Sequence, residues 1–154
     1  MKRKLIFILS ILIILHTLTA CSKDQILDSY DKVVDNAGEL ALTKESSLVG
    51  DKEKGKDDYT GEYAAQYEDF TGKEYIFGGT SLEERKTGTE LEVKVNFKIE
   101  KGSAKLIFVS GPNVPQVIIE KDGEWSGTVK LSKGSNYFYI EAENFSGTIN
   151  LNVG

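Results

Sequence analysis

Alternation of apolar and polar residues over residues 89–100 constrains the fold of this chain more than any other feature. The apolar positions are Leu91, Val93, Val95, Phe97 and Ile99, and the polar positions between them are Glu92, Lys94, Asn96 and Lys98. Successive side chains of a β-strand point to opposite faces, so the pattern predicts a strand with one face in a core and one in water. Half-exposed sheets of this kind are typically antiparallel.

Further segments rich in β-branched and aromatic residues recur along the second half of the chain. They predict strands over residues 63–70, 74–77, 89–100, 104–110, 117–119, 125–131, 137–143 and 149–153. Asp122-Gly123 is the strongest hairpin signal between them, and Pro115 favours an edge position or a late start for the strand after it. About eight short strands with turns every 8–12 residues indicate a mainly β fold, an antiparallel β-sandwich that is jelly-roll-like, with a small barrel as the alternative.

A helical pattern precedes these strands, over residues 23–42. Its apolar side chains recur at three- and four-residue steps, at Ile26, Tyr30, Val33, Ala37 and Leu40. Such a stripe predicts one amphipathic helix, and Ser22 with Gln25 fits a capping box at its start. The stripe could dock on the β-domain, lie on a membrane or pair with another chain. We expect it to dock on the chain's own domain.

A charged segment, residues 50–58, follows the predicted helix and lacks apolar residues. This composition predicts a flexible, solvated linker. A calcium site is disfavoured, because lysines are interleaved among the acidic residues and the regular alternation of oxygen ligands is missing. We therefore expect residues 21–58 to form a tether of helix and linker, and residues 59–154 to form the β-sandwich domain.

The first 20 residues have the layout of an export signal. Lys2, Arg3 and Lys4 are followed by an apolar run over residues 5–15. A helix that crosses a bilayer needs about 20 apolar residues, so the shorter run predicts a signal peptide and not a permanent span.

The signal segment closes with Leu18-Thr19-Ala20-Cys21. This motif resembles the lipobox of bacterial lipoproteins, whose cysteine receives a diacylglyceryl group before cleavage just ahead of it. The resemblance covers residues 1–21 and implies a signal peptide at 1–20, lipid on Cys21 and a place on the extracytoplasmic face of the cell membrane. Two acyl chains give stable attachment. The alternative is an uncleaved signal anchor, and the Lys-, Ile- and Asn-rich composition indicates a Gram-positive source.

Charge and residue usage exclude several classes of function. Removal of the signal takes away three of the 19 basic residues and no acidic ones, so the net charge falls from −5 to −8. A negative surface argues against nucleic acid and anionic lipid headgroups as partners. The single histidine, His16, leaves with the signal, and the single cysteine, Cys21, would carry lipid. We expect no triad of the Ser-His-Asp kind, no thiol nucleophile, no ordinary zinc site and no cofactor.

Aromatic residues are the candidate ligand-binding group. Trp125, Tyr137 and Tyr139 lie on predicted strands, and flat rings on a sandwich face stack on sugar rings. The competing interpretation is that tyrosine and tryptophan simply suit strands and half-buried positions.

Paired carboxylates are the candidate catalytic groups. Glu83-Glu84 and the same-face pair Glu141 and Glu143 are close in sequence. Glycosidases need one such acid in an apolar site that raises its pKa, whereas Glu141 and Glu143 are expected on a solvated face. No catalytic residue is predicted.

The sequence therefore predicts a membrane-anchored, non-catalytic binding module at the cell envelope. Its partner would be an envelope protein or a glycan. A carbohydrate-binding module, a small inhibitor or immunity lipoprotein, and a cell-wall hydrolase that uses carboxylates alone are the alternatives.

Overall fold

A computed structural model describes residues 42–80, 82, 85 and 87–154. The predicted signal peptide, Cys21 and the predicted helix up to residue 41 lie outside the described residues. Within that part of the chain the fold is mainly β, with six strands and a single short 3-10 turn, η1 (Glu45–Ser47). The strands are β1 (Asp51–Lys54), β2 (Gly61–Gly79), β3 (Glu90–Ser110), β4 (Gln116–Ile119), β5 (Gly123–Lys130) and β6 (Asn136–Val153). None of the helical structure in this part is long and apolar enough to cross a bilayer.

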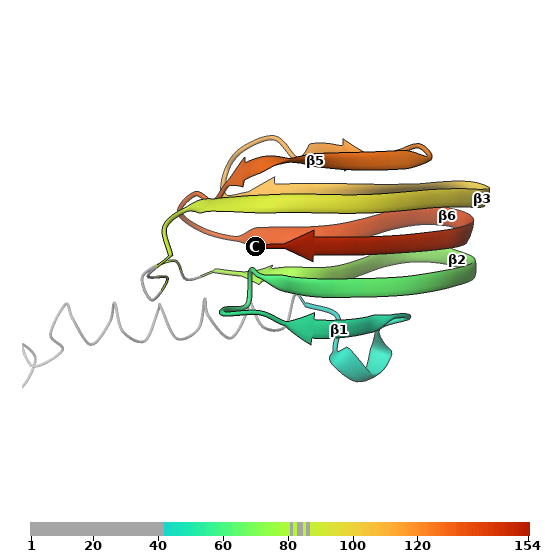
Figure 1. Ribbon diagram of the computed structural model, residues 1–154, viewed down its shortest axis with the longest axis horizontal. Coiled ribbons are helices and arrows are strands. Elements are labelled where there is room, and N and C mark those ends of the chain that lie inside the picture. The colour runs from blue at the N-terminus through green and yellow to red at the C-terminus, as the bar shows by residue number, and fades with distance from the viewer. Residues whose placement is uncertain (1–41, 81, 83–84, 86) are drawn as a thin grey trace, which may run out of the picture. The chain divides into compact units, whose positions relative to one another are not determined.

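All strand pairs are antiparallel, as the alternation predicted. The sheet order is β1-β2-β6-β3-β4, and β5 pairs with β3 as well (Figure 1). The last strand of the chain, β6, therefore lies between β2 and β3 along almost its whole length. β4 begins directly after Pro115 and lies at the end of the strand order, so the edge prediction is confirmed.

The three long strands bend near their middles. At the bends the backbone enters the left-handed region at Asp69 (φ 49°), Gly102 (φ 73°) and Asn144 (φ 48°). Asp, Asn and Gly are the residues that tolerate this conformation best. Each long strand curves over there, so its two halves lie one behind the other in Figure 1.

These bends explain why the expected strand number was wrong. Segments 63–70 and 74–77 are parts of β2, segments 89–100 and 104–110 are parts of β3, and the last two expected strands are parts of β6. A glycine or asparagine in a left-handed conformation marks a bulge within a strand as readily as a chain reversal. The sequence pattern alone does not distinguish the two.

The expected hairpin at Asp122-Gly123 is also wrong. β4 and β5 flank it, yet both pair with β3, on the second and first half of that strand respectively. The connection crosses at the bend of β3, where the Asp122 carboxylate accepts a hydrogen bond from the Ile99 backbone N–H at 2.6 Å. The Asp-Gly pair thus forms a crossover between two parts of the sheet.

One apolar cluster joins the two halves of the long strands. It contains the inward residues of the first half of β3, among them Leu91 and Val95, and those of its second half, Leu106 and Phe108. Phe108 stacks on Phe138 of β6 with 4.6 Å between ring centroids. Burial of this cluster between both halves holds the bent sheet together.

The charged segment predicted as a flexible linker is different in the structure. Residues 51–54 form β1, which pairs with β2 from Asp51 opposite Ala64 to Lys54 opposite Gly61. Backbone hydrogen bonds form this pair, and an edge strand keeps one side in water, so charged side chains are tolerated there. The charged composition of this segment therefore does not indicate whether its backbone is hydrogen-bonded in a sheet.

Candidate functional site

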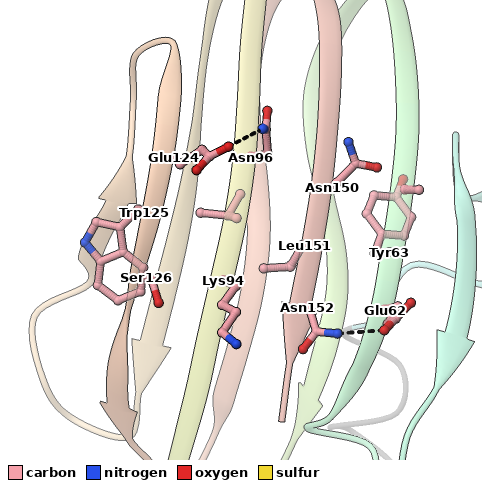
Figure 2. Close-up of a pocket in the computed structure, with 12 residues that line it drawn as sticks. Glu62, Tyr63, Lys94, Asn96, Glu124, Trp125, Ser126, Asn150, Leu151 and Asn152 are labelled. Carbon is pink, nitrogen blue, oxygen red and sulfur yellow. Dashed lines mark hydrogen bonds between the residues drawn. The ribbon is translucent and has the colours of Figure 1, made fainter.

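A shallow polar groove of about 560 Å³ lies on the exposed face of the sheet where the first halves of β2 and β3 meet the second half of β6 and β5 (Figure 2). Strand register sets its side chains in two rows that cross β2, β6, β3 and β5. The first row is Glu62, Asn152, Lys94 and Ser126, and the second is Ala64, Asn150, Asn96 and Glu124. These are the outward positions of the alternation, so the residues predicted to face water build the groove.

A side-chain hydrogen bond fixes one end of each row. Asn152 donates from Nδ2 to Glu62 at 2.7 Å, and Asn96 donates from Nδ2 to Glu124 at 2.9 Å, as Figure 2 shows. Each amide keeps its carbonyl oxygen as an acceptor, and each carboxylate keeps its second oxygen. The groove therefore has rigidly placed acceptors at both sides.

The middle of the groove keeps free hydrogen-bonding groups. Within the described part of the chain, neither the Asn150 amide nor the Lys94 ammonium has a side-chain hydrogen bond or an ion pair. Between them they supply amide donors, an amide acceptor and a cation. Ala64 beside Asn150 leaves the floor low on that side.

Trp125 lines the same groove from β5. It lies opposite Val95, is half-buried and packs against the apolar core. Its ring covers Gly127, where an added Cβ would lie 2.6 Å from the indole. Of the three aromatic residues singled out from the sequence, Trp125 alone lines this groove, but its register opposite the buried Val95 turns its ring to the core face of the sheet.

Tyr137 and Tyr139 lie elsewhere, on the first half of β6. Tyr139 stacks on Tyr75 with ring centroids 4.8 Å apart, and Tyr137 meets Tyr75 edge-on at 5.9 Å. Both are buried, with 6% and 7% of their surface exposed, and burial raises the pKa of each phenol. The structure thus separates this tyrosine pair from Trp125, which lies opposite the first half of β3, whereas Tyr139 lies opposite Ile107 in the second half.

The carboxylates weighed as catalytic groups do not share an apolar site. Glu141 lies between Lys73 and Lys105 in the strand register, 3.6 Å from the Lys73 ammonium, and Glu143 is exposed. Glu83-Glu84 lie outside the described residues.

A buried polar network was missed in the sequence. The Glu74 carboxylate, 2% exposed, accepts hydrogen bonds from the phenols of Tyr63 and Tyr67 and, at 2.6 Å, from the Val49 backbone N–H. Burial raises the pKa of both phenols. Glu74 belongs to the expected strand over residues 74–77, for which no face was assigned, and its spacing of two from Ile76 places both on the buried face. That spacing was the available signal.

The described part of the chain holds no group of three or more His, Cys, Asp or Glu side chains that could bind a metal ion. No model of a known protein family matches the sequence. No curated protein matches it either.

Proposed function

We propose that the protein is a lipid-anchored extracytoplasmic binding protein that holds its ligand on the polar groove without transforming it. The lipobox-like motif that ends in Cys21 supports the anchor. The β-domain is, in this proposal, a jelly-roll-like β-sandwich whose two layers are the two halves of the bent strands. The single apolar cluster between those halves supports that arrangement.

The ligand class that best fits the groove is a hydroxyl-rich glycan. The observation that carries this proposal is the pair of polar rows, with Asn150 and Lys94 free in the middle. Sugar hydroxyls both donate and accept hydrogen bonds, which amide and carboxylate pairs at fixed spacing match.

A glycan array probed with the full chain in detergent micelles tests this function. We expect binding of neutral glycans, followed by a loss of affinity of about tenfold in Asn150→Ala, because the bound hydroxyl loses its amide partner. Asn113→Ala is the matched control, since Asn113 is exposed on a loop outside the groove. Mass spectrometry of the bound glycan should show no cleavage.

The same array can also contradict the proposal. If no glycan binds, or if Asn150→Ala binds as tightly as the parent chain, the glycan proposal fails. Release of shortened glycan would reject the non-catalytic part of it.

A further inference from the structure

A second cleft, of about 650 Å³, lies beside β1 and away from the polar groove. Residues 42–45, β1, the loop over residues 55–60 and the end of β2 line it. Glycines 78 and 79 form part of its wall, so backbone rather than side chains faces the space there. We name it the lysine cleft for the four lysines that line it: Lys44, Lys52, Lys54 and Lys56.

The charge of the lysine cleft is opposite to that of the whole chain. Arg85 adds a fifth basic residue, and three acidic residues, Glu45, Asp57 and Asp58, lie among them. The cleft thus has a surplus of two positive charges, whereas the chain has a net charge of −5. A concave surface of one sign concentrates ligands of the other sign.

Two of the three acids are already neutralised within the cleft. Asp57 accepts from the Arg85 guanidinium at 2.8 Å, and the Arg85 side chain is only 4% exposed. Asp58 lies 2.5 Å from the Lys54 ammonium. These pairs leave Lys44, Lys52 and Lys56, for which no described carboxylate lies within ion-pair distance.

Lys52 is the deepest of these three lysines. Its ammonium lies 5.3 Å from the centre of the Phe77 ring and is half-buried, and burial lowers its pKa. The nearby charges of Glu45 and Asp58 act in the opposite direction. An anion that supplies hydrogen-bond acceptors stabilises a partly desolvated ammonium of this kind.

We propose that the lysine cleft binds a phosphomonoester dianion, a site separate from the glycan groove. A phosphomonoester carries about two negative charges at neutral pH, which matches the surplus of the cleft, and it has three acceptor oxygens for three lysines. Lysine is a common partner of phosphate because it acts as a compact point charge. A carboxylate ligand would leave one charge of the surplus unmatched.

Calorimetric titration of the full chain in detergent micelles tests the site. The probes are inorganic phosphate, glycerol 1-phosphate and dihexanoyl phosphatidic acid, with acetate as the singly charged comparison. We expect at least one phosphate probe to bind and acetate to bind about tenfold more weakly. Binding of glycerol 1-phosphate indicates a soluble source of the phosphate, and binding of the lipid alone indicates a headgroup.

Substitutions test whether the phosphate binding measured by calorimetry takes place in the lysine cleft. Lys44→Gln with Lys56→Gln removes two exposed charges without touching the core and should weaken phosphate binding by about tenfold. Lys52→Gln should do the same, with its fold checked by circular dichroism because Lys52 packs over Phe77. Lys121→Gln with Lys130→Gln makes the same charge change at exposed positions outside both the groove and the cleft and should leave affinity unchanged.

Three results would overturn the proposal. They are no binding of any phosphate probe, equal affinity for acetate, and full affinity in the Lys44 and Lys56 double variant. Each is independent of the glycan array, so failure of one site does not affect the other.

Discussion

Asp69 and Asn144 adopt the same left-handed backbone conformation on neighbouring strands, at the level where β2 and β6 bend. Side chains of the adjoining segments connect the two bends. The Asp69 backbone N–H donates to the Ser146 hydroxyl at 3.1 Å, and the Asn144 N–H donates to the Thr71 hydroxyl at 2.8 Å. Each bend is therefore capped by a residue of the other strand.

The third bend, at Gly102, should tolerate no side chain. An added Cβ would lie 2.2 Å from the Asn144 carbonyl oxygen, in addition to the cost of φ 73°. We expect Gly102→Ala to lower the free energy of unfolding by about 2 kcal/mol or more. Gly123→Ala is the control, because Gly123 also has positive φ but no atom within 4 Å of the new Cβ, and about 1 kcal/mol is expected there. Equal losses in urea denaturation would show that the close approach is unimportant.

The buried Glu74 network should contribute strongly to stability. Glu74→Ala leaves two phenols and the Val49 N–H without their acceptor, and each such group costs about 1–3 kcal/mol. Tyr67→Phe keeps the ring and removes one donor, for an expected loss of about 1.5–3 kcal/mol. Denaturant unfolding measures both.

Tyr75→Phe is the matched control for that series. The Tyr75 hydroxyl has no hydrogen bond among the described residues, so a change within about 0.5 kcal/mol is expected. A loss in Tyr67→Phe no larger than this would contradict the role of the network.

Stability should fall at alkaline pH. Burial, with neighbouring Tyr137 and Asp58, raises the pKa of Tyr59 to about 12, compared with 10.0 for a free phenol. The unfolded chain therefore loses this proton first. The stability from the neutral phenol is complete below pH 10 and is lost as pH rises toward 12. Unfolding free energies at pH 9 to 12 should fall less steeply in Tyr59→Phe, and parallel curves would refute this assignment.

The proposed lipid anchor gives the simplest cellular prediction. The parent protein should partition into the detergent phase, and Cys21→Ser should remain in the aqueous phase, because the variant has no thiol to receive a diacylglyceryl group. Phase separation followed by immunoblotting measures this. Equal partitioning of the two proteins would rule out the anchor.

The sequence predicted the faces of the strands better than their connections. Alternation from Leu91 to Phe97 identified the buried side, and all these positions are buried in β3. It did not show that Gly102 and Asn144 bend strands rather than end them, because both outcomes use the same left-handed residues. The alternation also did not show that β1 pairs with β2, because that pairing is made by backbone hydrogen bonds.

The candidate sites were predictable to different degrees. Trp125 was singled out, yet its ring turns to the core face, whereas Lys94 was assigned to the wet face without a role and Asn150 was not singled out. Their significance lies in the register that aligns four strands, and register joins residues such as Glu62 and Asn152 that are far apart in sequence. The lysine cleft combines β1 with the distant Arg85, so no local pattern could reveal it.

The position of β6 in the middle of the sheet has a consequence for synthesis. β2 and β3 both take their main partner from residues 136–153, the last strand to be made. Until that segment has been translated, most of the ladder has no partner, and such distant pairings form slowly. A nascent chain of this topology therefore completes its sheet only after residues 136–153 have been translated.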